Sequence, residues 1–562
     1  MSSRNGETEP LLPGRSSTQA NLYAGRGLVP ALRDSTPVED TGSSDEQVLA
    51  CEGVAGQDDD EDAPAMRHLG MTSTVFLIFN RIVGTSVFAT PSVILRASGS
   101  VGLSLVMWLV GATIAACGTA VYVELGTALP KNGGEKNYLE YIYQRPRLLM
   151  ACAYAAYAML IGWSAANASV FGEYLLHVVD PTRTPPPFAT RLAGASCITF
   201  ALLIHGTRPT WGLRLQNTLG VVKLTILIAV ALSGLAALAR LPGFRLEDPP
   251  RNFDWSTMWE GSGNGGVSAF VTGLYTVMWA FDGYSNANYA LSEVRDPVHT
   301  IKLAAPLAVL CVAIAYLLAN VAYFAVVPKD EILGSGRIVA ALFFGRLWGI
   351  GAERFVAAIV ATSAFATVMT VLYAQGRVIQ ALGQEGIIPF SGFFASNKPF
   401  GAPFAGLFEQ WFVSSTLVVA VPPGDAYLFT INAVTYPISL INTFVSLGLL
   451  YLHTPLRRRL SPTLHALWAP PFRAWTPVAA VFFLSNVFLV LAPLVPPAPG
   501  FKVYENLPYW LHALAAASIS LFGVVYWYVY WQWLPRRGGY RLVRKWIRVD
   551  GVRKGIMRKV KL

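Results

Sequence analysis

Long apolar runs set the main constraint on how this chain can fold. A helix crosses the bilayer core with about 20 mostly apolar residues, and twelve such runs follow one another along the sequence. Charged residues make up only 14% of the 562 residues, against roughly 25% in a soluble domain. The pattern predicts an all-α polytopic membrane protein with twelve transmembrane helices. The runs lie at residues 72–95, 101–128, 146–179, 190–206, 214–239, 265–291, 301–327, 355–382, 402–421, 426–452, 474–494 and 507–533.

Lysine and arginine in the loops predict which side of the membrane each loop faces. These residues concentrate in cytoplasmic segments close to the helix ends. If both termini are cytoplasmic, the inner segments near the membrane hold 26 lysine and arginine residues, whereas the outer loops hold 11. We therefore expect a multi-pass integral membrane protein with both termini in the cytoplasm.

Two polar tails divide the chain into three parts, residues 1–68, 69–533 and 534–562. The first tail carries 13 acidic and 5 basic residues and should be a disordered cytoplasmic segment. The last tail carries 11 basic residues and one acidic residue, so it either contacts anionic lipid on the cytoplasmic leaflet or remains solvated. No nucleic-acid-binding module accompanies this positive charge, so nucleic acid is not an expected partner.

A short motif in the first tail bears on localisation. The sequence "ETEPLL", Glu7 to Leu12, fits the acidic dileucine pattern that sorting adaptors bind. We expect the plasma membrane, with an endosomal or vacuolar membrane as the alternative if this motif is a true sorting signal.

Two of the apolar runs carry their weakest helix formers near their centres. These are Gly84-Thr85-Ser86 in the first run and Asp282-Gly283 in the sixth. In transporters built from inverted repeats, helices are often broken at mid-membrane, where freed backbone groups bind the substrate. One such segment alone is equally well explained by close helix packing. Two segments that lie five helices apart favour a substrate-binding site.

Four motifs resemble one family of membrane proteins. The motifs are "FNRIVGTSVFATPS" from residue 79, "YVELGTALPKNGGEKNYLEYIY" from residue 122, "WAFDGYSNANYALSEVRDP" from residue 279 and "YAQGRVIQALGQEGIIP" from residue 373. They resemble the amino acid–polyamine–organocation superfamily, most of all its L-type amino acid transporter family and, within it, the fungal methionine permeases. The resemblance covers about residues 70 to 530 and leaves both tails outside.

The resemblance implies a LeuT-type core, in which helices 1–5 and 6–10 form inverted repeats with broken helices 1 and 6. It implies that backbone N–H groups at Gly84 to Ser86 bind the substrate carboxylate. Carbonyl groups of Ile82, Trp279 and Asp282 would bind the ammonium, and Trp279 would also be an aromatic gate. Ser86 stands where the family has a third glycine. The expected substrate-binding residues are Ile82, Gly84, Thr85, Ser86, Trp279, Ala280, Phe281, Asp282 and Gly283.

Four charged residues within the apolar runs need an explanation. Asp282 stands where the family has a small or apolar residue, and it could bind a substrate cation, titrate with a coupled proton or pair with a fixed base. By the family's pattern, Lys223 reaches toward the broken part of helix 1 and replaces the sodium ion of sodium-coupled relatives. Arg81 and Glu124 lie near the cytoplasmic thirds of helices 1 and 2, and we expect them to pair as a structural contact or an inner gate.

Together these features predict a secondary active transporter of neutral L-amino acids, with methionine favoured, that works by alternating access without sodium. The alternatives are a cationic amino acid or polyamine carrier that uses Asp282, and a sensor that binds without transporting. No nucleophile, phosphate-binding or metal-ligand motif is present, so we expect neither an enzyme nor a bound cofactor or metal. Relatives in the family that form a disulfide with a single-span heavy chain use a cysteine in the loop between helices 3 and 4. The corresponding loop here, residues 180–191, has no cysteine, so the resemblance implies no covalent heavy chain. The expected partners are the amino acid and the bilayer lipids.

Overall fold

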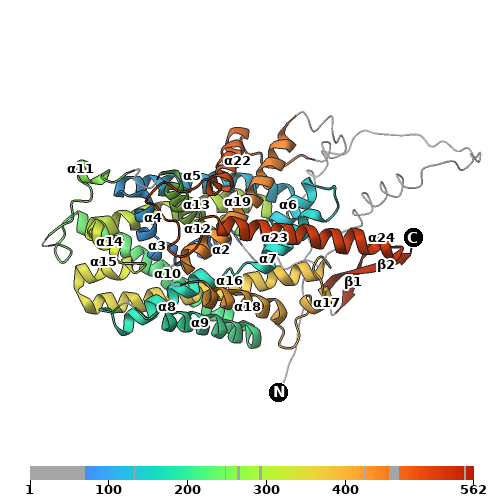
Figure 1. The fold of residues 1–562 in the computed structure, drawn as a ribbon, viewed down its shortest axis with the longest axis horizontal. Helices are drawn as coiled ribbons and strands as arrows, with labels where there is room; N and C mark the ends of the chain where they lie inside the picture. Colours follow the sequence, from blue (N-terminus) through green and yellow to red (C-terminus); the bar gives the residue numbers. More distant parts are fainter. Residues whose placement is uncertain are drawn as a thin grey trace, which may run out of the picture. The chain divides into compact units, whose positions relative to one another are not determined.

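The structure is a computed structural model in which long helices pack side by side (Figure 1). Residues 1–68, with the Glu7–Leu12 motif, lie outside the described part of the chain, so their expected disorder and sorting role stay predictions. The structure describes residues 70–131, 133–183, 185–246, 248–262, 266–289, 291, 294–422, 425–454, 468–549 and 552–561.

Ten helical segments in the described ranges are long and apolar enough to cross a membrane. They coincide with ten of the twelve predicted runs. The sixth and ninth predicted runs contain shorter apolar helices, α12 (Gly266–Ala280) and α18 (Phe404–Ala420). The ten segments are Met71–Ala89, Val101–Ala128, Leu149–Val179, Pro187–Thr207, Pro209–Leu238, Pro297–Val326, Ile350–Gln384, Ala426–His453, Thr476–Leu494 and Leu511–Gly538.

The first run is broken, as expected from its weak helix formers. Helix α2 (Met71–Ile82) ends because Val83 adopts an extended conformation, with φ −72° and ψ 92°. The chain resumes as α3 (Ser86–Ala89) and then α4 (Pro91–Ser98). Proline suits the first turn of α4, since that turn leaves its backbone donors unpaired. The break therefore covers residues 83–85, one residue before the predicted position.

The sixth run is broken as well. Helix α12 ends at Ala280, residues 281–285 form turns, and the 3-10 helix η1 (Asn286–Tyr289) follows. Gly283 has a φ of +118°, a backbone conformation that residues other than glycine rarely adopt. The two breaks thus lie within one or two residues of the positions expected from the sequence.

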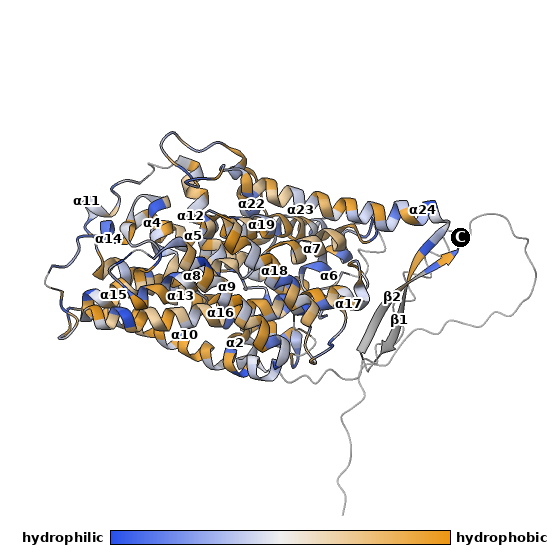
Figure 2. Ribbon diagram, turned by 60° about the horizontal axis from the view of Figure 1, so that its bottom comes forward, coloured by the Kyte–Doolittle hydropathy of each residue, from blue (hydrophilic) through white to orange (hydrophobic). Residues whose placement is uncertain are grey.

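The remaining long helices show their hydrophobic residues along most of their length (Figure 2). The predicted run 146–179 is two helices, since residues 161–164 interrupt it. The helices are α5 (Val101–Ala128), α7 (Leu149–Leu160), α8 (Ala165–Val179), α9 (Pro187–Thr207), α10 (Pro209–Leu238), α13 (Pro297–Val326), α16 (Ile350–Gln384), α19 (Ala426–His453), α22 (Thr476–Leu491) with η3 (Ala492–Leu494), and α23 (Leu511–Trp527) with η4 (Tyr528–Trp533) and α24 (Leu534–Gly538).

Short elements gather at the two ends of the helix bundle. Helices α6 (Glu135–Ile142) and α17 (Ser391–Phe394) lie at one end, which we call the α6 end (Figure 1). Helices α11 (Trp255–Met258), α14 (Lys329–Gly334) and α15 (Val339–Trp348) lie at the other, the α14 end. Loops that were predicted to share a side of the membrane therefore share an end of the bundle. That the α6 end faces the cytoplasm stays a prediction.

The basic C-terminal tail corrects the all-α expectation. It forms two antiparallel strands, β1 (Tyr540–Val549) and β2 (Val552–Lys561), with Val549 opposite Val552. The sequence explains this result, because Asp550-Gly551 between two segments rich in Val and Ile is a strong two-residue hairpin signal.

A cluster of large buried side chains holds the α12 break in place. The ring of Phe281 lies 5.5 Å from that of Tyr316 on α13 and 6.2 Å from that of Trp108 on α5. Trp108 and Tyr316 also contact each other, with ring centres 5.4 Å apart. Aromatic pairs of this kind add about 0.5–1.5 kcal/mol beyond their area burial. The cluster therefore fixes the end of α12 against two continuous helices.

Candidate functional site

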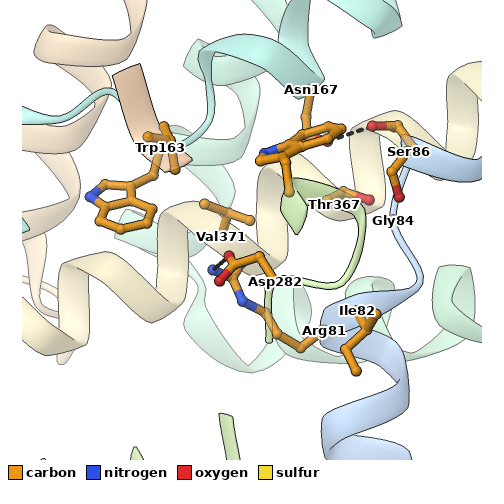
Figure 3. A pocket seen from close by; sticks show the side chains of 12 residues that line it. Arg81, Ile82, Gly84, Ser86, Trp163, Asn167, Asp282, Thr367 and Val371 are labelled. Atoms are coloured by element: carbon orange, nitrogen blue, oxygen red, sulfur yellow. Dashed lines mark hydrogen bonds and ion pairs between the residues drawn. The ribbon is translucent and has the colours of Figure 1, made fainter. Parts of the chain in front are cut away.

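A small cavity of about 30 Å³, here called the central cavity, lies between the two breaks (Figure 3). It includes six of the nine predicted substrate-binding residues, drawn from both breaks. Helices α8, α16 and α19 complete the wall. The lining residues are Arg81, Ile82, Gly84, Thr85, Ser86, Trp163, Asn167, Trp279, Asp282, Thr367, Val371 and Val434.

Side-chain hydroxyl groups stabilise the break between α2 and α3. The hydroxyl of Tyr316 donates to the carbonyl of Ile82 at 2.9 Å and lies 3.3 Å from the hydroxyl of Ser86. Thr85 Oγ1 donates to Asn167 Oδ1 at 2.6 Å. A carbonyl that leaves a helix needs such a partner in a buried site. The Ile82 carbonyl, which the resemblance assigns to the substrate ammonium, thus already accepts one hydrogen bond.

Lys223 lies behind the same break and is separated from it by one side chain, that of Thr367. Its Nζ donates to Thr367 Oγ1 at 2.7 Å, and the residue is only 3% exposed. A Cβ added to Gly84 would lie 3.4 Å from Thr367 Cγ2, so Thr367 stands between Lys223 and the break. Lys223 therefore approaches the broken part of helix 1 through α16, and in the described structure it is not among the residues that line the central cavity.

Asp282 pairs with a fixed base. Arg81 Nη2 lies 3.2 Å from Asp282 Oδ2, and the two side chains point toward one another in Figure 3. The side chains are 14% and 27% exposed, respectively. A Cβ on Gly283 would lie 2.5 Å from Arg81 Cγ, so glycine at this position makes room for the arginine. Of the three roles considered for Asp282, pairing with a base is the one visible in this structure.

The expected pair between Arg81 and Glu124 is wrong. Glu124 is fully buried and accepts hydrogen bonds from His453 Nε2 at 2.8 Å, the Ala474 N–H at 2.8 Å and Trp468 Nε1 at 3.3 Å. The physical reason is the direction in which Glu124 leaves α5, toward the end of α19 and the segment before α22. Arg81 remains at the cavity, whereas Glu124 lines no described cavity.

The three residues at the end of α12 point in different directions. Trp279 lines the central cavity, and its ring meets that of Tyr427 edge to face at 5.9 Å. Phe281 turns into the aromatic cluster with Tyr316, and Ala280 is fully buried. Neither Ala280 nor Phe281 lines the central cavity in the described structure, so only their backbone groups remain as candidate contacts.

A larger cavity of about 650 Å³, here called the vestibule, extends from Asp282 toward the α6 end. Arg81, Trp163 and Asp282 line both the central cavity and the vestibule. The Arg81–Asp282 ion pair therefore stands at the boundary between the two cavities. Other lining residues include Glu135, Lys136, Tyr154, Tyr289, Arg377 and Glu385.

Packed side chains fill the path from the central cavity toward the α14 end. Trp279 contacts Tyr427, and the guanidinium of Arg337 lies over the Tyr427 ring with Cζ 4.6 Å from its centre. Arg337 Nε donates to Glu173 Oε2 at 2.6 Å. Burial lowers the pKa of Arg337 to about 10, so this side chain, which lies between α14 and α15, remains charged at neutral pH.

Sequence reasoning missed several residues that the structure brings to the cavity. Asn167 and Thr367 are polar residues inside apolar runs, and this was a usable signal. Nothing in the sequence shows toward which neighbour such a side chain turns. Within the described ranges, no group of three or more His, Cys, Asp or Glu side chains could hold a metal ion.

Comparison with known proteins identifies the family. Residues 69–518 match the family model described as amino acid permease. The chain belongs to this family. Its members are polytopic membrane proteins with a LeuT-like fold, so this permease is a multi-pass integral membrane protein and a transporter rather than an enzyme.

Three relatives show the range of similarity. The permease is 44% identical over 479 residues to the high-affinity methionine permease of Saccharomyces cerevisiae, covering 85% of this chain and 82% of the relative. It is 30% identical over 490 residues to the low-affinity methionine permease of the same yeast, covering 86% of each chain. It is 27% identical over 431 residues to human b(0,+)-type amino acid transporter 1, covering 76% of this chain and 83% of the relative.

Proposed function

We propose that this permease is a secondary active transporter of neutral L-amino acids, with methionine favoured, that works by alternating access without sodium. The observation that carries the proposal is the central cavity between two helix breaks, five predicted helices apart. The similarity to two yeast methionine permeases supports the choice of substrate.

The cavity offers complementary partners for each part of an α-amino acid. Backbone N–H groups at Gly84 to Ser86 lie in the break and at the start of α3, and they suit the carboxylate because the start of a helix favours negative charge. The carbonyl end of α12 suits the ammonium. Val371, Val434 and Trp163 supply an apolar wall for a medium-sized side chain. The present volume of about 30 Å³ holds little more than water, so binding requires the lining to move apart.

The Arg81–Asp282 pair argues against a cationic substrate. A lysine side chain or a polyamine would have to displace Arg81 from Asp282, leaving the guanidinium without its carboxylate partner. Binding would then gain little free energy, because the new ion pair would only take the place of the existing one. A neutral amino acid leaves the pair intact.

The finer membrane arrangement is also part of the proposal. We count α12 and α18 as spans six and nine, which gives twelve helices with two inverted repeats of five. The α6 end then faces the cytoplasm with both termini, and the plasma membrane is the expected location. The grouping of the predicted inner loops at one end supports this arrangement.

Counterflow in proteoliposomes tests the proposal. Vesicles with the purified permease are loaded with unlabelled methionine, leucine, lysine or spermidine, and uptake of the labelled form of the same compound is compared. We expect methionine to exchange fastest and spermidine not to exchange. Exchange of lysine but not methionine would show a cationic carrier. Binding of methionine without any counterflow would show a sensor.

A further inference from the structure

Three acidic side chains line the central cavity and the vestibule in the described structure, and two of them pair with bases. Asp282 pairs with Arg81, and Glu385 pairs with Lys136. Glu135 is the exception, because no described base pairs with it and its described side-chain partners are hydroxyl groups. An ionisable group without a fixed counter-charge, in the wall of a cavity large enough for water, can change its protonation state at moderate cost.

Glu135 is buried and connects two separate parts of the chain. The residue is 7% exposed and begins α6, which lies outside the candidate spans. Its Oε1 accepts from Ser285 Oγ at 3.2 Å, and its Oε2 accepts from the Tyr289 hydroxyl at 2.5 Å. Ser285 and Tyr289 belong to the segment that follows the α12 break. The carboxylate therefore ties the loop at the α6 end to the broken helix.

The loop also packs closely against the same segment. A Cβ added to Gly134 would lie 2.8 Å from the Tyr289 ring, so glycine lets the loop approach that ring. Protonation of Glu135 would turn one accepting oxygen into a donor. One of the two hydroxyl bonds would then be lost or reversed, and the contact between loop and broken helix would weaken.

The surroundings of Glu135 favour uptake of a proton when water leaves. Burial raises the pKa of Glu135, and the hydrogen bonds from Tyr289 and Ser285 oppose this shift in part. Lys136, its neighbour in sequence, is held by Glu385 and Glu140. The titratable or charged groups that face Glu135 or share its cavity are Tyr122 on α5, Lys136, Tyr138 and Glu140 on α6, Tyr154 on α7, Arg81 on α2, Asp282, Tyr284 and Tyr289 after α12, and Tyr373, Arg377 and Glu385 on or just after α16.

We propose that Glu135 is the proton-binding site of this permease at the vestibule. The carboxylate binds a proton that enters from the α14 end while the vestibule is closed around it, and it releases this proton into the vestibule when the vestibule opens. The step is a simple protonation, so no other reactant is consumed. The proposal rests on the transport function proposed above and adds a proton gradient as the driving force.

The experiment separates exchange from accumulation. Proteoliposomes carry wild type, Glu135→Gln, Glu135→Asp or the control Glu140→Gln, which alters an acid on the same helix that pairs with Lys136. Methionine exchange is measured at equal pH, and methionine accumulation is measured with the vestibule side more alkaline by one unit. Such a gradient drives at most about tenfold accumulation per proton, because one pH unit is 1.36 kcal/mol.

We expect Glu135→Gln to exchange methionine within about threefold of wild type but to lose accumulation, because an amide cannot titrate. Glu135→Asp and Glu140→Gln should still accumulate methionine. A pH-sensitive dye inside the vesicles should report proton movement with methionine in wild type and not in Glu135→Gln.

Three results would overturn the proposal. Accumulation by Glu135→Gln equal to wild type would exclude this residue as the proton site. Equal loss of exchange in Glu135→Gln and Glu135→Asp would show a structural contact instead. Wild-type protein that exchanges methionine without accumulating it would refute proton coupling while leaving the proposed substrate intact. Absence of any methionine exchange by wild type would instead refute the proposed function.

Discussion

The two ends of the transport path differ in how their charged side chains are surrounded. At the α14 end, Arg337 and Glu173 pair between packed elements, and the guanidinium also covers the Tyr427 ring. At the α6 end, Arg81 and Asp282 pair at the edge of a vestibule of about 650 Å³. The first pair closes a path, whereas the second borders an open one. The structure is therefore open toward the α6 end and closed toward the α14 end.

The difference also shows why ion pairs suit a path that opens and closes in the proposed alternating-access cycle. A closed end made only of apolar side chains would resist opening by roughly 25 cal/mol for each Å² exposed. A desolvated ion pair costs solvation when it forms and regains that solvation when it separates. Its net free energy is therefore close to zero. Arg337 and Glu173 can hold the α14 end closed without making it permanent.

The largest expected effect concerns the residue between the two ends. Lys223→Ala removes the ammonium that holds Thr367 beside the Gly84 break. Loss of a charge-assisted hydrogen bond of about 1.5–3 kcal/mol lowers an equilibrium constant by roughly tenfold to a hundredfold. Loss of the break geometry adds to this effect. We therefore expect methionine counterflow to be abolished. The control is Lys329→Ala, because Lys329 Nζ only donates to the carbonyl of Glu260 in an exposed loop. Normal counterflow by Lys223→Ala would remove this residue from the mechanism.

The next effect tests the closed end directly. Arg337→Ala leaves the Glu173 carboxylate without its guanidinium. We expect the α14 end to open more often. An impermeant thiol reagent added on that side should then label Val434→Cys in the central cavity about tenfold faster. This rate corresponds to a closed state that is less stable by about 1.4 kcal/mol. Labelling of the protein without the added cysteine, measured in parallel, corrects for the native thiols.

A matched arginine in the same region provides the control. Arg346 pairs with Glu331, but these side chains are 38% and 42% exposed. Exposed pairs contribute about 0–1 kcal/mol, so Arg346→Ala should leave the labelling rate of Val434→Cys unchanged. If both arginine variants raised labelling equally, the Arg337–Glu173 pair would have no special part in closure.

Much of this comparison could be anticipated from the sequence. Gly84-Thr85-Ser86 and Asp282-Gly283 marked both breaks, because weak helix formers inside apolar runs are a local property. The partners of charged residues could not be anticipated. Arg81 pairs with Asp282 and Glu124 with His453, since the face from which each side chain leaves its helix depends on packing across more than 200 residues of sequence. The strands of the C-terminal tail were missed although Asp550-Gly551 signalled a turn.

A smaller effect is expected at the open end. Asp282→Asn keeps the size of the side chain and leaves Arg81 at the border of the vestibule, whose volume of about 650 Å³ leaves room for water to replace the lost carboxylate. We expect methionine exchange and methionine accumulation to change by less than about threefold, as for a pair with a net contribution below about 1 kcal/mol. Lysine should remain a poor substrate in both proteins.

The matching double variant sharpens this test. Arg81→Gln with Asp282→Asn removes both charges and should behave like Asp282→Asn alone. Loss of accumulation with intact exchange in Asp282→Asn would move the proton site from Glu135 to Asp282. If the wild type prefers lysine and Asp282→Asn transports lysine tenfold more slowly than the wild type, Asp282 binds the substrate.

The last test replaces sodium with choline, and we expect no effect. It concerns the central cavity, which lies between the two ends. Lys223 places a positive charge 2.7 Å from Thr367 Oγ1, next to the break at Gly84. A sodium ion about 4 Å from this ammonium would meet a repulsion of about 4 kcal/mol at an effective dielectric constant of 20. That repulsion would weaken sodium binding by roughly a thousandfold, because each 1.4 kcal/mol is tenfold. Methionine counterflow should therefore be the same in sodium and in choline buffer. Strict dependence on sodium would show that Lys223 does not replace the ion, and the two ends would then have to be coupled through a cation that binds and leaves in each cycle.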